Sequence, residues 1–132
     1  MQIPFEPRAI DEMLRVRNSK WTVAIVLKLR SHKLRFNELR REIGISQKTL
    51  TATLRALERD GLVSRTSYAT TPPRVDYALT DLGREALRVF EAWEDFAMRH
   101  WAEVLASRRR FDDAVGSGPG VPRHFDYSRE EV

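Results

Sequence analysis

Cysteine is absent from the 132 residues of this chain. Its absence excludes disulfides, thiolate metal sites and a cysteine nucleophile. No apolar run approaches the roughly 20 residues that a membrane-spanning helix needs. The first residues, MQIPFEPRAIDEM, contain acids and proline where a signal peptide has an apolar stretch. We therefore expect a cytoplasmic protein that does not associate with a membrane.

Groups suited to catalysis are also scarce. The histidines are His32, His100 and His124, and none has a metal-like spacing with another ligand. Ser46 is better explained as a helix cap than as a nucleophile. An enzyme would need a nucleophile with its base, a metal cluster or a phosphate-binding loop, and none of these is recognisable. The sequence predicts no enzyme, no metal and no cofactor.

Positive charge, by contrast, is plentiful and unevenly distributed. Residues 1–80 hold 15 Lys/Arg and 8 Asp/Glu, a net charge of +7, whereas residues 81–132 carry a net charge of −3. A basic front half indicates a polyanionic partner that is engaged by this half alone. The alternative is that the charge only solvates a small basic domain.

The periodicity of the apolar residues predicts an α+β, mainly α, fold: a winged helix-turn-helix with a long C-terminal dimerisation helix. Lys20 to about Leu29 is apolar nearly all round, so this helix should lie across the core. Leu34–Phe36 can supply only a very short strand. The domain boundaries follow from these periods: one domain over 1–111, with the helix-turn-helix at about 37–60, the wing at 62–80 and terminal dimer helices at about 8–17 and 81–111, then a flexible tail over 112–132.

The helix-turn-helix has local signals at both of its helices. Gly44 lies in the tight link, where a residue without a β-carbon costs least. Ser46 is a good N-cap for the second helix, and Gly61 is placed for a left-handed C-cap. Leu50, Leu54 and Leu57 recur at i, i+4 and i+7, so they predict one buried stripe.

The face opposite this stripe carries the residue types that read DNA. Lys48 and Gln47 can bond to base edges, and Thr51 and Ala52 can touch a thymine methyl. Arg55 lies further along the helix and suits a phosphate better. The other predicted phosphate contacts are Arg59 of the same helix and Arg40 and Arg41 of the preceding one. The alternative is that these residues only form a solvated polar face. The wing predicted directly after this helix argues against that alternative.

Two strand-like segments follow, joined by a proline-bearing loop. Pro72, Pro73 and Arg74 form the expected wing tip. A rigid loop that presents one arginine suits the narrow minor groove, whose negative potential attracts a guanidinium group. The alternative is a hairpin whose prolines only protect a sheet edge.

Several of these segments together resemble the HxlR family of bacterial regulators, which are relatives of the MarR-type winged helices. The similarity covers about residues 8–100 and is carried by Lys20-Trp21-Thr22, 35–41, 45–51, 54–63, 72–80 and Leu82-Gly83. The resemblance implies a homodimeric transcription factor that pairs through its first and last helices on inverted-repeat operators. Many family members carry a cysteine near the N-terminal helix, and this chain does not, so its signal is not a thiol.

The terminal helices give this dimer a physical basis, because their aromatic residues would leave an apolar patch on a monomer. The predicted interface comprises Ile10, Met13, Leu14, Phe90, Trp93, Phe96, Ala97 and Trp101. We favour a dry, filled dimer core. The alternative is a pocket for a small apolar effector, lined by Trp21, Trp93 and Phe96.

A rival interpretation is a winged-helix module for protein–protein assembly that does not bind DNA. Such a module needs no cationic exposed helix face, so Lys48, Arg55 and Arg74 favour a double-stranded DNA partner.

Overall fold

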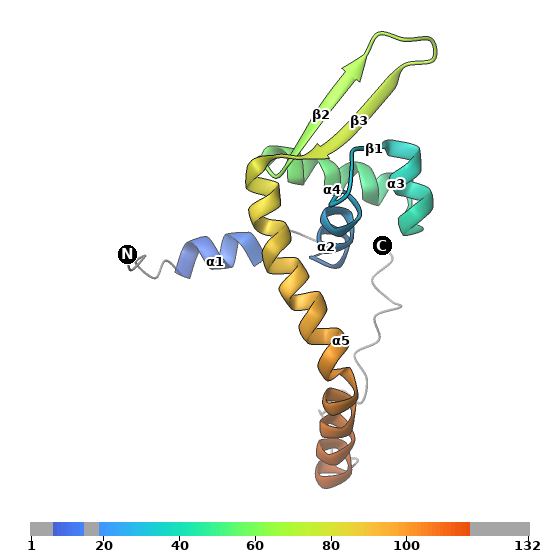
Figure 1. The fold of residues 1–132 in the computed structure, drawn as a ribbon. Coiled ribbons are helices and arrows are strands. Elements are labelled where there is room, and N and C mark those ends of the chain that lie inside the picture. The colour runs from blue at the N-terminus through green and yellow to red at the C-terminus, as the bar shows by residue number, and fades with distance from the viewer. Residues whose placement is uncertain (1–6, 15–18, 117–132) are drawn as a thin grey trace. The chain divides into compact units, whose positions relative to one another are not determined.

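A computed structural model describes residues 7–14 and 19–116 of the chain (Figure 1). The described residues fall into two compact units, divided between Trp93 and Glu94, which are treated separately below. No described helix is long and apolar enough to cross a bilayer. The elements are α1 (Pro7–Leu14), α2 (Ser19–Lys28), β1 (Leu34–Arg35), α3 (Phe36–Ile43), α4 (Gln47–Arg59), β2 (Val63–Tyr68), β3 (Arg74–Leu79) and α5 (Asp81–Val115).

The core of the first unit is built around α2, as its apolar sequence predicts. Ile25, Val26 and Leu29 are fully buried, and α2 contacts both α3 and α4. The apolar stripe of α4 meets them: Leu50, Leu54 and Leu57 are all buried. Burying one such side chain stabilises the fold by roughly 1.5–3 kcal/mol, so this cluster holds the helix-turn-helix on its support.

The turn between α3 and α4 has the predicted chemistry. Gly44 has φ 73°, a left-handed conformation that costs other L-residues energy, and its N–H donates to Arg40 O at 2.9 Å. Ser46 is the N-cap of α4, and its Oγ accepts from the Thr49 N–H at 3.2 Å. Gly61 closes the helix with φ 78°, also as predicted. These caps determine where α4 begins and ends.

The wing is a three-stranded antiparallel sheet with the order β1-β3-β2. Figure 1 shows β2 and β3 extending beyond the helices of this unit. In the register, Leu34 of β1 lies opposite Tyr77, and Val63 of β2 lies opposite Leu79. All four are buried, so this face of the sheet covers the core. The short strand ends at Arg35, because Phe36 already begins α3.

The first turn of α5 is tied to the base of the wing. Thr80 Oγ1 donates to Gly61 O at 2.6 Å and accepts from the Gly83 N–H at 3.0 Å. A β-carbon at Gly83 would lie 2.0 Å from the carbonyl oxygen of Leu62. The contact between the helix and the turn after α4 is therefore closer than any residue except glycine permits.

The two terminal helices compare differently with the prediction. α1 spans Pro7–Leu14, and residues 15–17 of the predicted 8–17 helix lie outside the described residues. α5 continues to Val115, so the expected tail does not begin at Asp112. Nothing in Asp112–Val115 breaks a helix, and Gly116 follows with φ 64°. The remainder of the predicted tail, 117–132, lies outside the described residues.

The second unit contains the distal part of α5, which carries its own surface contacts. Arg99 pairs with Asp95 at 3.2 Å, and His100 lies 3.0 Å from Glu103. Its large apolar side chains remain exposed in the protomer: Phe96 is 48% and Trp101 49% accessible. Trp93, the last residue of the first unit, is 65% accessible.

Candidate nucleic-acid interface

The exposed face of α4 lies opposite the leucine stripe, as its 100° periodicity predicts. Every predicted reading residue of this helix is exposed: Gln47, Lys48, Thr51, Ala52, Arg55 and Arg59. Thr53, which sequence reasoning did not single out, is buried, and its hydroxyl donates to Thr49 O at 2.7 Å. This bond to the preceding turn satisfies the only hydroxyl that α4 buries. The exposed polar side chains of α4 therefore lie on its outward face.

Within the described part of the chain, the cations of the helix-turn-helix have no acidic partners. Among the described residues, no carboxylate lies within 4.0 Å of Arg40, Arg41, Lys48, Arg55 or Arg59, and all five side chains are exposed. Arg30, on another surface, pairs with Glu91 at 3.9 Å. Unpaired cations add up to a positive field over the surface and attract a polyanion.

Arg74 lies at the first position of β3, directly after the loop 69–73 that joins β2 to β3 at the end of the wing. Its guanidinium makes two hydrogen bonds to Asp76, from Nε at 2.9 Å and from Nη2 at 2.8 Å. It also stacks over the Tyr68 ring at 5.1 Å. Bidentate pairs of this kind fix geometry as well as charge. The predicted minor-groove residue is thus held against the sheet and is 37% exposed.

The pair changes the ionisation of both groups. The hydrogen bond from Arg74 lowers the pKa of the Asp76 carboxyl, opposed by burial and helped by the nearby Arg74 and Lys33 charges. The same hydrogen bond raises the pKa of Arg74. Both groups therefore stay charged at neutral pH.

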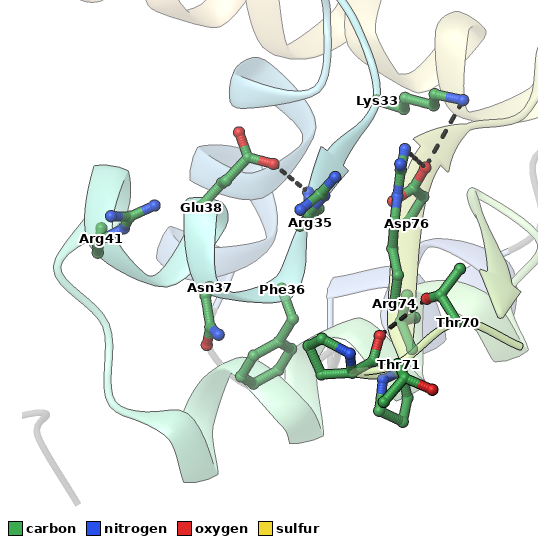
Figure 2. Close-up of a pocket in the computed structure, with 13 residues that line it drawn as sticks. Lys33, Arg35, Phe36, Asn37, Glu38, Arg41, Thr70, Thr71, Arg74 and Asp76 are labelled. Atoms are coloured by element: carbon green, nitrogen blue, oxygen red, sulfur yellow. Dashed lines mark hydrogen bonds and ion pairs between the residues drawn. The ribbon is translucent and has the colours of Figure 1, made fainter. Parts of the chain in front are cut away.

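A cleft of about 930 Å³ separates the start of α3 from the wing loop (Figure 2). Figure 2 shows Arg74 and Asp76 on the wing side and Glu38 and Arg41 on α3. Sequence reasoning missed Lys33, Arg35 and Asp76, which also line it. Side chains alternate along β3, so Asp76 lies on the face opposite Tyr77, but only the register brings Arg35 next to it.

The order of these elements, from α2 through the turn and wing to α5, is matched by a family model. The model described as HxlR-like helix-turn-helix covers residues 16–110. The chain belongs to the HxlR-like helix-turn-helix family. The resemblance to this family, drawn from the sequence motifs, is confirmed.

Relatives of this HxlR-like protein are named as transcriptional regulators. YtfH of Escherichia coli K12, an HTH-type transcriptional regulator, is 42% identical over 98 residues, which are 74% of this chain and 78% of the relative. The solved structure of ytfH from Salmonella typhimurium has a TM-score of 0.69 and 40% identity, covering 75% of this chain and 89% of that one. The redox regulator HypR in its reduced form has a TM-score of 0.67 and 35% identity, covering 75% and 98%.

The remaining predicted residues of the HxlR-like chain lie in several environments. Trp21 is half-buried against the core, with Lys20 Nζ 4.7 Å from its ring. Phe90 also packs against the core, so part of it is already covered within the protomer. Met13 is 58% exposed, and Ala97 is exposed. The side chains of Ile10 and Leu14 lie outside the described residues. The dimer interface and the effector pocket stay predictions.

Proposed function

We propose that this chain is a sequence-specific DNA-binding transcriptional regulator that acts as a homodimer on inverted-repeat operators. The exposed cationic face of α4, which pairs with no carboxylate of the described residues, supports it most directly. Gln47, Lys48, Thr51 and Ala52 lie in the first two turns, where a helix in the major groove contacts base edges. Arg55 and Arg59, with Arg40 and Arg41, hold phosphates.

The exposed aromatic residues of α5 support the homodimer. Trp93, Phe96 and Trp101 are all exposed on α5, and large apolar groups exposed on one helix mark an interface. A twofold dimer repeats the recognition helix roughly 34–36 Å away, one turn of DNA, which gives an inverted repeat. Sedimentation equilibrium tests this part: a monomer at micromolar concentration would overturn it.

The signal of this regulator does not involve a thiol, because the chain has no cysteine. The redox regulator HypR therefore serves as a guide to the fold and not to the sensing chemistry. A small apolar effector is the alternative signal that the sequence suggests.

A binding assay with labelled duplexes tests DNA binding itself. Operator candidates come from selection of random duplexes, and fluorescence anisotropy then measures affinity against salt concentration. We expect log affinity to fall steeply with log salt, and Lys48→Glu and Arg55→Glu each to weaken binding at least tenfold. Arg84→Glu is the matched control, because Arg84 is exposed at the start of α5, where an acidic residue suits the helix dipole.

Two results would favour the assembly module over the regulator. One is the absence of binding at every salt concentration. The other is binding that Lys48→Glu, Arg55→Glu and Arg84→Glu reduce equally, because general charge would then explain it.

A further inference from the structure

One buried carboxylate organises the outer face of the wing sheet. Asp76, on the central strand, is only 4% exposed although it points away from the apolar face. Its register partners are Arg35 on β1 and Thr66 on β2, and residues directly opposite one another share a face. Arg74 binds it through two hydrogen bonds, and Lys33 Nζ lies 3.6 Å from its Oδ2.

The cleft that Asp76 lines carries a net positive charge. Four cations line the cleft against two carboxylates, a net charge of +2: Lys33, Arg35, Arg41 and Arg74 against Glu38 and Asp76. The carboxylate of Glu38 accepts from the backbone N–H of Arg35 at 3.1 Å. Among the described residues no carboxylate pairs with the side chain of Arg35 or of Arg41. The surplus charge therefore faces the open cleft.

The cleft continues onto the helix-turn-helix. Asn37 and Arg41 line it and also line a second hollow of about 650 Å³, which reaches Arg40 and Gly44. The cations thus form a row from the wing along α3, and not a ring around one point. A row of like charges matches a ligand with repeated negative charge better than it matches a single small anion.

We propose that this cleft receives the phosphodiester backbone of the bound duplex, with Lys33 and Arg35 as phosphate contacts that the helix-turn-helix pattern does not reveal. Asp76 is a positioning residue: it holds Arg74 and Lys33 in the cleft wall. A backbone strand separates the major groove from the neighbouring minor groove, so such a strand runs between a recognition helix and a wing on one duplex. The cleft opens between the wing and α3, the helix that directly precedes the recognition helix α4. This inference rests on the proposed function.

The salt dependence of DNA binding measures these contacts one at a time. Removing one phosphate contact lowers the slope of log affinity against log salt by about 0.9, which corresponds to about an 8-fold loss at 0.1 M relative to 1 M salt. We expect Arg35→Ala and Lys33→Ala each to show this loss, equally on the selected operator and on an unrelated duplex. Arg35→Lys, which keeps the charge, should keep most of the slope. Arg84→Ala should leave it unchanged.

The outcomes separate this inference from the proposed function. If Lys48→Glu abolishes binding but Arg35→Ala and Arg84→Ala have the same slope, the cleft is not on the backbone and the inference is wrong while the function stands. If wild-type protein binds no duplex, both are wrong. Titration of free protein with inorganic phosphate is the second arm: Arg35-dependent micromolar binding with an unchanged DNA slope would make the cleft a small-anion site and overturn the inference.

Discussion

Gly83 allows α5 to start directly against the turn that follows α4, and replacing it with alanine tests how closely these segments pack. The added Cβ would lie 2.0 Å from Leu62 O and 3.0 Å from Leu62 C. Both are backbone atoms, so no side-chain rotation relieves the contact. Leu62 O also accepts from the Thr80 N–H at 3.1 Å, which limits how far it can move.

Three contributions determine how Gly83→Ala changes the free energy of unfolding: one stabilises the variant and two destabilise it. Alanine in a helix is ordinarily more stable than glycine by about 1 kcal/mol. Forcing a methyl group into a filled site costs about 1–3 kcal/mol, and separating the segments weakens a hydrogen bond worth about 1 kcal/mol. We expect Gly83→Ala to lower the free energy of unfolding by about 2 kcal/mol, and the Tm by about 6–12 °C for a domain of this size.

Thermal and urea unfolding at a fixed protein concentration measure this change, since a dimer makes the Tm depend on concentration. Gly44→Ala is the matched control: it has φ 73° but nothing within 4 Å of its added Cβ, so it reports backbone strain alone. A Gly83→Ala protein as stable as wild type, or more stable, would refute the close approach of α5 to Leu62.

Three further changes test the helix cap, the wing carboxylate and the core. Ser46→Ala should destabilise the fold by about 1 kcal/mol in urea unfolding, while Ser46→Asp, which keeps an acceptor for the Thr49 N–H, should not. Arg74 lowers the pKa of Asp76 in the folded state. The charged Asp76 therefore stabilises the fold fully above the ordinary aspartate pKa of about 3.9, and this stabilisation is lost as the pH falls through the lowered pKa. Asp76→Asn should remove this part of the acid dependence. The free energies of unfolding of the variant and of the wild type should therefore converge as the pH is lowered from 6 to 2, and curves that stay parallel over this range would contradict the prediction. Leu50→Ala, in the fully buried stripe, should cost about 2–5 kcal/mol by the same unfolding assay, and a cost below 1 kcal/mol would contradict the core assignment.

Much of the candidate interface was predictable because its signals are local. The Ser46 cap, the spacing of Leu50, Leu54 and Leu57, and the left-handed Gly61 each depend on residues within one or two helical turns. Such features form whenever the chain is helical, and the face opposite the stripe is then determined by geometry. Local signals do not determine the end of α5. The helix was predicted to end at residue 111 and continues to Val115, because the residues at 112–115 do not break a helix.

By itself, the sequence determined the helix-turn-helix, the positions of the wing strands and the residues that α4 presents to solvent. Only the tertiary structure placed Arg35 opposite Asp76, 41 positions later in the chain, and Gly83 against Leu62. It also showed that Arg74 begins β3 and bonds to Asp76 in the wall of the cleft. The physical reason is that a strand register and a close backbone approach are set by the packing of whole elements, whereas caps and apolar stripes are set by neighbouring residues.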